Sequence, residues 1–166
     1  LMGSTLKLLL SFFSSGATFG RPLSLFDNTP LYHLLMENIQ LHHLPGLIEK
    51  GHLHALCITA LGYQSGQSIS FFQGHASVDP WQRSRRVGIR ADLTHKHLMA
   101  SSALPALFPA VRINREYFGD GAMRQTAPMS AALHLGAEKL LVVGVSGNRK
   151  NGRSDPGRLV NYSPSL

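Results

Sequence analysis

The chain has 166 residues, of which 43% are hydrophobic and 15% are charged, and its formal net charge is +7 at pH 7. This length fits one domain or part of one, and this composition excludes a fibrous protein or a wholly disordered one. The single cysteine, Cys57, excludes an internal disulfide and a four-cysteine zinc site. We expect its thiol to be buried and inert, because it lies in an apolar run.

The first quarter of the chain has the residue spacing of two helices. Residues 4–13 repeat leucine and phenylalanine at helical spacing, and this run is too short and too interrupted to span a bilayer. A loop rich in small residues follows it. A second helix is predicted over residues 28–38, where Pro30 fits the first turn. Three of its leucines are expected to face the core: Leu31, Leu34 and Leu35.

Short extended segments alternate with helices through the rest of the chain. Strands are expected at residues 53–60, 68–73, 111–113 and 117–118, and helices at residues 94–102 and 128–135. The apolar run at residues 139–146 does not alternate with polar residues, which is typical of a strand buried on both faces of a mainly parallel sheet. The order of these elements favours the α/β class, with helices layered on a central sheet.

Basic residues gather in two places. The first group is Arg83, Arg85, Arg86 and Arg90, and the second is Arg149, Lys150, Arg153 and Arg158. Such clusters attract anionic partners such as phospholipid headgroups, nucleic acid or acidic proteins, although a solvated basic face has the same appearance. Because no interleaved aromatic residues or recognition helix accompany them, we do not expect nucleic-acid binding.

Asp120 is the acidic residue whose setting is most typical of a catalytic group. It lies on an Asp-Gly turn between an extended segment and a helix that begins at a proline, so it is expected at the mouth of a sheet, where an acid or base is useful. Gly121 would let the backbone turn sharply there and leave space beside the carboxylate. The alternative is that Asp120 only closes an Asx-turn between the strand and the helix.

Two motifs in this region resemble the second half of the catalytic domain of patatin-like phospholipases. In that family an Ala-Ser-x-Ala-x-Pro-x-x-Phe-Pro-Pro segment precedes an Asp-Gly-Gly or Asp-Gly-Ala motif. Residues 100–111 match the segment, with Ala110 in place of the last proline, and the Asp-Gly-Ala form follows at Asp120, Gly121 and Ala122. The resemblance covers about residues 20–146.

The resemblance implies a layered α/β/α patatin-like domain and a serine-dependent lipid acyl hydrolase. Its substrate would be a lipid or phospholipid, its catalytic unit a Ser-Asp dyad with Asp120 as proton acceptor, and it would need no cofactor or metal. Two departures stand out, because the 166 residues contain neither a G-x-S-x-G elbow nor a Gly-rich oxyanion loop. In addition, Thr126 replaces an asparagine of the family.

In the family both absent elements precede the matching segments. We therefore expect the chain to be a fragment that is incomplete at both ends. Residues 1–146 would be the C-terminal part of the acyl hydrolase domain, and residues 147–166 a polar basic tail that starts a truncated C-terminal region. The expected location is cytoplasmic, or peripheral on a membrane with an anionic surface.

Two other functions fit parts of the sequence. A non-catalytic, patatin-like remnant could bind anionic lipid surfaces through the arginine clusters. A metal-dependent hydrolase could use some of the nine histidines. The pair His95 and His97 argues against this alternative, because two residues two positions apart on a helix project about 200° apart and cannot chelate one ion.

Overall fold

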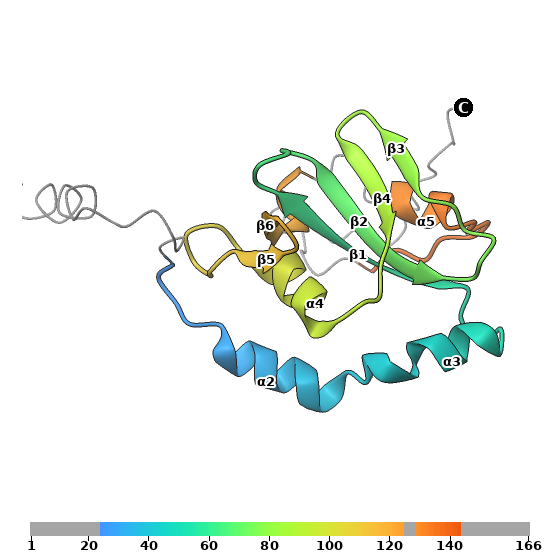
Figure 1. Cartoon of the computed structure of the whole chain (residues 1–166), viewed down its shortest axis with the longest axis horizontal. Coiled ribbons are helices and arrows are strands. Elements are labelled where there is room, and N and C mark those ends of the chain that lie inside the picture. Colours follow the sequence, from blue (N-terminus) through green and yellow to red (C-terminus); the bar gives the residue numbers. More distant parts are fainter. Residues whose placement is uncertain (1–23, 125–128, 144–166) are drawn as a thin grey trace, which may run out of the picture.

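One six-stranded sheet organises the residues that this computed structural model describes, 24–124 and 129–143. Its strands are β1 (Ala55–Gly62), β2 (Ser68–Gly74), β3 (Trp81–Arg83), β4 (Arg86–Arg90), β5 (Val111–Ile113) and β6 (Glu116–Asp120). Across the sheet they lie in the order β3-β4-β2-β1-β6-β5 (Figure 1). The strands expected at residues 53–60, 68–73, 111–113 and 117–118 are therefore confirmed as β1, β2, β5 and β6, whereas β3 and β4 were not expected from the sequence.

The sheet is mixed. Only β2 and β4 pair in parallel, whereas β1–β2, β1–β6, β3–β4 and β5–β6 are antiparallel. The α/β class is confirmed, but the expectation of a mainly parallel sheet is wrong for the described residues. The reason lies in the connections, because tight turns such as the two-residue turns of β3–β4 and β5–β6 can join only antiparallel neighbours.

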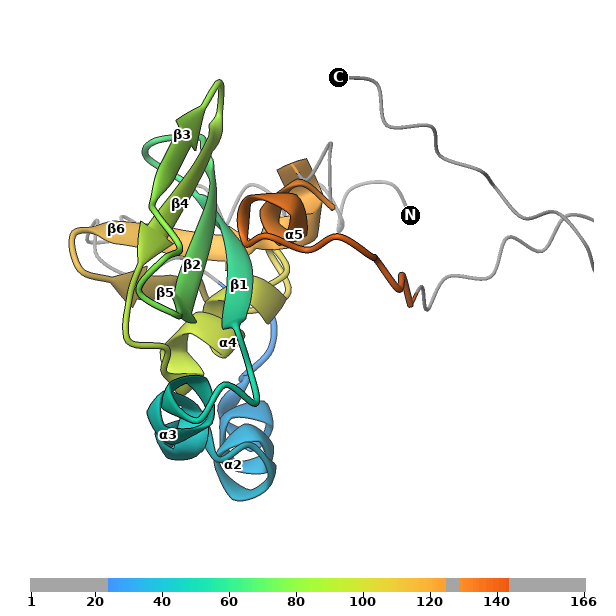
Figure 2. The same cartoon turned by 90° about the vertical axis from the view of Figure 1, so that its right-hand side faces the viewer.

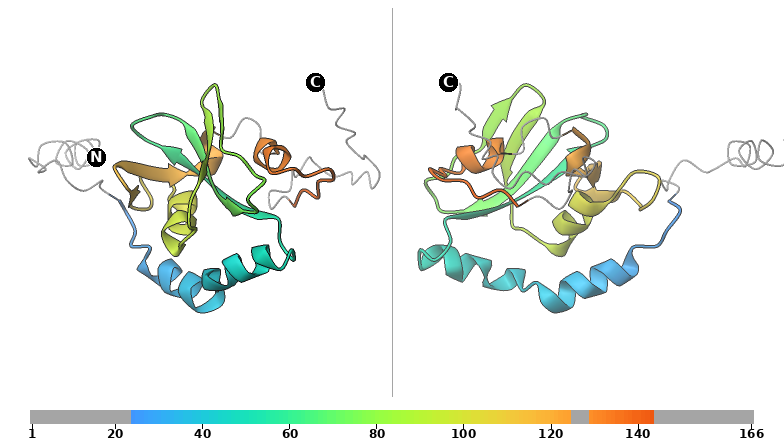
Figure 3. Two further views of the ribbon diagram at one scale, coloured as in Figure 1. Left: turned by 45° about the vertical axis from the view of Figure 1, so that its right-hand side comes forward. Right: turned by 180° about the vertical axis from the view of Figure 1, so that it is seen from behind.

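The helices surround this sheet. They are α2 (Thr29–Asn38), α3 (Leu44–Glu49), α4 (His95–Ser102) and α5 (Ser130–His134), with short 3-10 helices η1 (Leu41–His43) and η2 (Gly121–Arg124). α2, η1 and α3 form one run along an edge of the molecule, and α5 lies apart from them (Figures 2 and 3). Within the described ranges, no helix is long and apolar enough to cross a membrane.

The hydrophobic core lies between α4 and one face of the sheet. Ile58 and Ala60 of β1 point to this face, where Phe71 of β2 meets Phe118 of β6 with their ring centroids 5.3 Å apart. Ala100 of α4 is fully buried against them. Because side chains alternate along a strand, the neighbours of these residues lie on the opposite face, which carries Thr59, Ser70 and Trp81.

The helix expected at residues 28–38 is confirmed as α2, but its core face is narrower than predicted. Leu31 and Leu35 are half-buried, whereas Leu34 is 57% exposed. α2 meets the rest of the fold mainly at the start of α4, where the rings of Tyr32 and His95 are 6.5 Å apart. A helix at the edge of a domain covers its neighbour with one stripe only, so the expectation for Leu34 is wrong.

The strand expected at residues 139–146 does not form over its described part, residues 139–143. Leu141, Val142 and Val143 are 92%, 68% and 82% exposed, and this segment pairs with none of the described strands. An apolar run indicates burial, but it does not specify the partner strand that burial requires. Residues 144–146, the expected helix at 4–13 and the tail at 147–166 lie outside the described residues.

The expected helices at 94–102 and 128–135 correspond to α4 and α5. Gly136 has a φ of +89° and ends α5, as its position after the helix predicted. The first residue of the second prediction, Pro128, lies outside the described residues. The turn at Asn114 and Arg115 between β5 and β6 is also confirmed.

Candidate active site

Asp120 is the last residue of β6 and lies opposite Ala60 of β1. Its backbone N–H donates a hydrogen bond of 2.9 Å to the carbonyl oxygen of Ala103, just beyond the end of α4. The residue is half-buried. Three elements thus fix the position of Asp120: it belongs to β6, it pairs with β1, and its backbone N–H is bound by the residue after α4.

The Asx-turn proposed as the alternative role of Asp120 is present. Oδ1 of Asp120 accepts a hydrogen bond of 2.9 Å from the backbone N–H of Ala122. Among the described residues this is the one hydrogen bond that the carboxylate accepts, and it leaves Oδ2 for another group. A structural role and a chemical role are therefore compatible in Asp120, because Oδ1 closes the turn while Oδ2 can accept a proton.

Gly121 packs directly on the backbone of β1. A Cβ atom at this position would collide with the carbonyl oxygen of Thr59, and Gly121 is buried. Its φ is not in the left-handed region, so the glycine is required by space rather than by an unusual turn. Ala122, by contrast, is exposed. The Asp-Gly-Ala motif therefore presses η2 against the sheet and fixes the direction in which the chain leaves Asp120.

Tyr63, in the turn between β1 and β2, lies beside this motif. Its hydroxyl covers Gly119, where a Cβ atom would collide with it. Burial, and next the negative charge of Asp120, raise the pKa of Tyr63 above its usual range. The phenol therefore stays protonated near the carboxylate. No sequence pattern marks this tyrosine, because only the β1–β6 pairing brings it to Asp120.

Polar side chains also meet on the sheet face opposite the core. The hydroxyls of Thr59 and Ser70 lie 3.1 Å apart, and Ser70 is buried. Burial raises the pKa of the nearby Cys57 thiol, while hydrogen bonds from Ser70 and Thr59 act in the opposite direction. Cys57 is half-buried rather than fully buried as expected, and the raised pKa agrees with an unreactive thiol.

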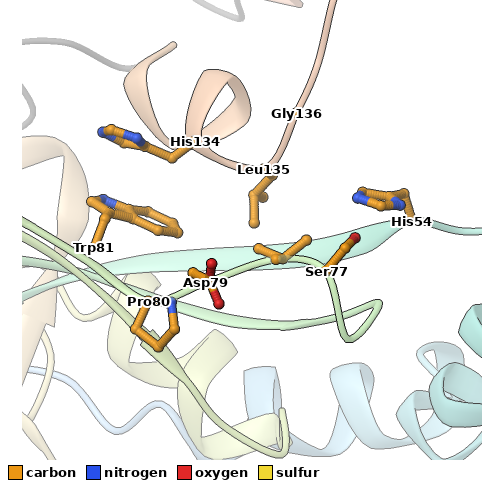
Figure 4. A pocket seen from close by; sticks show the side chains of 9 residues that line it. His54, Ser77, Asp79, Pro80, Trp81, His134, Leu135 and Gly136 are labelled. Carbon is orange, nitrogen blue, oxygen red and sulfur yellow. The ribbon is translucent and has the colours of Figure 1, made fainter.

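A pocket of about 420 Å³ opens between α5 and the connection from β2 to β3 (Figure 4). His134 stacks on Trp81 at one side, with ring centroids 4.8 Å apart, and His54 and Ser77 lie at the other. His54 immediately precedes β1, whereas Asp120 pairs near its far end. At about 3.4 Å per residue, His54 is roughly 20 Å from Asp120 along the strand, and Trp81 on β3 lies four strands from β6, at about 4.8 Å per strand. This pocket is therefore distinct from the Asp120 site.

The two histidines of α4 have separate structural partners. A ring nitrogen of His95, Nε2, lies 2.8 Å from the carbonyl oxygen of Ile39. Nδ1 of His97 accepts a hydrogen bond of 3.0 Å from the backbone N–H of Thr94, and the ring packs against Phe71. Burial lowers the pKa of His97. Over residues 24–124 and 129–143, no three His, Cys, Asp or Glu side chains come together as metal ligands would.

Comparison with known proteins identifies one protein family, whose model covers most of the elements described above. A family model described as patatin-like phospholipase matches residues 5–133. The matched range includes both the segment at residues 100–111 and the turn at Asp120. No match was found among curated proteins or among solved structures.

Proposed function

This chain belongs to the patatin-like phospholipase family, and we propose that it is part of a serine-dependent lipid acyl hydrolase in which Asp120 is the proton acceptor. Members of this family are typically hydrolases that act on lipids. The match covers more than three quarters of the chain, since it runs from residue 5 to residue 133 of 166.

The setting of Asp120 is the observation that supports this role best. Its carboxylate is half-buried at the end of a strand, and its backbone is tied to Ala103. One oxygen closes the turn to Ala122, and the other accepts no hydrogen bond from residues 24–124 or 129–143. A base must be held within hydrogen-bond reach of the proton that it removes, and a side chain fixed in this way costs little reorganisation during the reaction.

In the proposed reaction a serine oxygen attacks the ester carbonyl while its proton passes to Asp120. The acyl group then forms an ester with the serine, the protonated Asp120 gives its proton to the leaving alcohol, and water releases the fatty acid in the same way. The 166 residues contain no G-x-S-x-G elbow. The proposal therefore places the serine and the oxyanion loop in polypeptide outside them, with residues 1–146 as the C-terminal part of the catalytic domain.

The test needs a longer gene product that includes such an elbow. Hydrolysis of 4-nitrophenyl butyrate and of phosphatidylcholine would be measured for the parent and for Asp120→Asn. We expect turnover to fall by at least about 100-fold, the usual contribution of a general base. The melting temperature should stay unchanged, because an asparagine oxygen can still accept the Ala122 N–H.

Asp79→Asn is the matched control, since Asp79 is exposed and lies in the distant pocket. It removes the same charge and should leave turnover unchanged. Retained turnover in Asp120→Asn would remove Asp120 from the mechanism. A failure of the parent to hydrolyse either substrate, or to react with a fluorophosphonate serine probe, would favour the second candidate.

That second candidate is a non-catalytic member that binds anionic lipid surfaces. Its support is the excess of basic residues, 16 lysines and arginines against nine acidic residues. It predicts salt-sensitive binding to anionic vesicles without hydrolysis in any length of the gene product.

A further inference from the structure

Three tight turns of the sheet lie at one end of the molecule and are linked by hydrogen bonds. The backbone N–H of Ser68, at the β1–β2 turn, donates to the carbonyl oxygen of Arg85 in the β3–β4 turn at 2.9 Å. On the other side, the N–H of Tyr63 donates to the carbonyl oxygen of Tyr117 near the β5–β6 turn, also at 2.9 Å. The turns of β1–β2 and β3–β4 point the same way in Figure 1.

Six arginines gather on these turns and on the adjoining η2. We call them the arginine rim: Arg83, Arg85, Arg86, Arg112, Arg115 and Arg124. All are exposed except Arg86, which is half-buried. Nη1 of Arg124 donates to the carbonyl oxygen of Gly66 at 2.6 Å, and Nε of Arg112 donates to that of Asn114 at 3.2 Å. Basic residues that are distant in the sequence therefore lie at the same end of the sheet.

Two acidic residues, Glu116 and Asp120, also lie at this end, so they offset only part of the charge of the six arginines. Glu116 accepts a hydrogen bond of 2.7 Å from the N–H of Ser65, and Asp120 closes its own turn. Arg83 and Arg86 lie directly opposite each other on β3 and β4. Burial lowers the pKa of the nearby His134, and the charges of Arg83 and Arg86 lower it further. The charges of Arg83 and Arg86 therefore act on α5.

The β3–β4 turn holds its basic residues in a fixed arrangement. Arg85 has a φ of +60°, a left-handed conformation that residues with a side chain seldom adopt. Only Ser84 and Arg85 separate the paired residues Arg83 and Arg86. Such a short turn has few alternative conformations, so three arginines project from four consecutive residues of a small, well-defined hairpin.

Exposed apolar side chains accompany the basic ones. Met123, next to Arg124 on η2, is 58% exposed, and Tyr63 of the β1–β2 turn is 42% exposed. Tyrosine is enriched at the level of lipid headgroups, and arginine there meets the phosphates. This combination fits a lipid interface better than nucleic acid, which would favour aromatic rings interleaved with the basic residues.

We propose that the arginine rim is the surface through which this protein docks on anionic lipid bilayers. The choice of lipid as the partner rests on the proposed function. Asp120 lies opposite Ala60, two residues inside the end of β1 at Gly62, so it is about 7 Å from the end of the strand. Docking through the rim brings the end of the sheet that carries Asp120 to the membrane.

The test is co-sedimentation of the full chain with phosphatidylcholine vesicles that do or do not contain phosphatidylserine. The rim variant is Arg85→Gln with Arg115→Gln, two exposed residues from different turns. At about 1 kcal/mol for each basic residue near an anionic surface, the double change should weaken binding roughly 30-fold. Ether-linked lipids, which an ester hydrolase cannot cleave, keep the vesicles intact.

Two control variants each remove two positive charges, as the rim variant does, but from other parts of the chain. Lys50→Gln with Lys96→Gln changes exposed residues at the end of α3 and the start of α4. Arg149→Gln with Arg153→Gln changes the second basic cluster of the sequence. Both should bind nearly as well as the parent, and all variants should keep the parent melting temperature.

Several results would overturn the inference: binding without phosphatidylserine dependence, an equal loss in either control, or tighter binding to DNA than to anionic vesicles. Its failure is distinguishable from failure of the proposed function, because hydrolysis of the soluble ester 4-nitrophenyl butyrate needs no vesicle. If hydrolysis is absent and the binding pattern holds, the docking surface stands while the enzyme assignment falls.

Discussion

The hydroxyl of Tyr63 rests on Gly119, the residue directly before Asp120. A turn between β1 and β2 thereby reaches across to β6, and the backbone hydrogen bond between Tyr63 and Tyr117 fixes the approach. The absence of a side chain at Gly119 makes the contact possible. Burial and the charge of Asp120 together raise the pKa of Tyr63, so the phenol is a protonated neighbour of the candidate base.

Substitution of Gly119 should remove both causes at once. In Gly119→Ala the new methyl group pushes the phenol outward, which is easy because Tyr63 is 42% exposed. The phenol then loses its burial and moves away from Asp120, so its pKa should fall toward the ordinary value of about 10. Titration of ¹³C-labelled tyrosine by NMR would measure this fall.

Asp120→Asn provides the comparison, because it removes the charge and leaves the burial. Since burial is the larger cause, Asp120→Asn should lower the pKa of Tyr63 less than Gly119→Ala does. If the two variants lower it equally, or if Gly119→Ala leaves it unchanged, the contact between Tyr63 and Gly119 does not control this group.

Gly121 should tolerate no larger residue. A Cβ atom there meets the backbone carbonyl of Thr59, which cannot move without disturbing β1. Gly121→Ala should therefore destabilise the protein by about 1–3 kcal/mol, the usual cost of overpacking. Gly46→Ala in α3 is the matched control, because no atom lies within 4 Å of its new Cβ. It should stabilise the protein slightly. Thermal unfolding of both variants measures the difference.

The sequence predicted those parts of the fold that local chemistry determines. The hairpin of β1 and β2, the helix α4 after Thr94 and the turn at Asn114 all follow from residues close together in the chain. Asp120 was also found in this way, because an Asp-Gly step between a strand and a helix is a local pattern. Its partners Ala103 and Tyr63 come from other elements and could not be predicted.

Pairing between distant segments accounts for what the sequence did not predict. The parallel pair of β2 and β4 depends on which strand edge is free, and no residue pattern encodes that choice. The run at residues 139–143 has the composition of a buried strand, yet it pairs with none of the described strands and Leu141 is 92% exposed. The arginine rim likewise joins residues from 83 to 124, of which only the first group was visible as a cluster.

Cys57 should react slowly with alkylating reagents in the folded protein. Burial raises the pKa of its thiol and so reduces the reactive thiolate at neutral pH. Iodoacetamide labelling should be several-fold slower than in urea-unfolded protein. Ser70→Ala removes a hydrogen bond that lowers this pKa, so it should slow the reaction further. Faster labelling of Ser70→Ala at an unchanged melting temperature would contradict this account of the thiol.

His97 should make the fold sensitive to mild acid. Burial against Phe71 lowers the pKa of its imidazole, so the folded protein resists protonation there. The unfolded chain takes up the proton as the pH falls through about 6.5, the ordinary histidine value. Between that pH and the lower pKa of the folded state, the unfolded state binds more protons, and the free energy of unfolding must decrease as the pH falls.

His97→Gln tests this dependence without removing the helix cap. Glutamine at this position can still accept the Thr94 N–H, as in a capping box, but it does not titrate. Urea unfolding at several pH values between about 5 and 7.5 should show a shallower loss of stability on acidification than in the parent. Some loss should remain, because burial and two arginine charges lower the pKa of His134 in the same direction. An identical pH profile in the two proteins would show that His97 is not the group responsible.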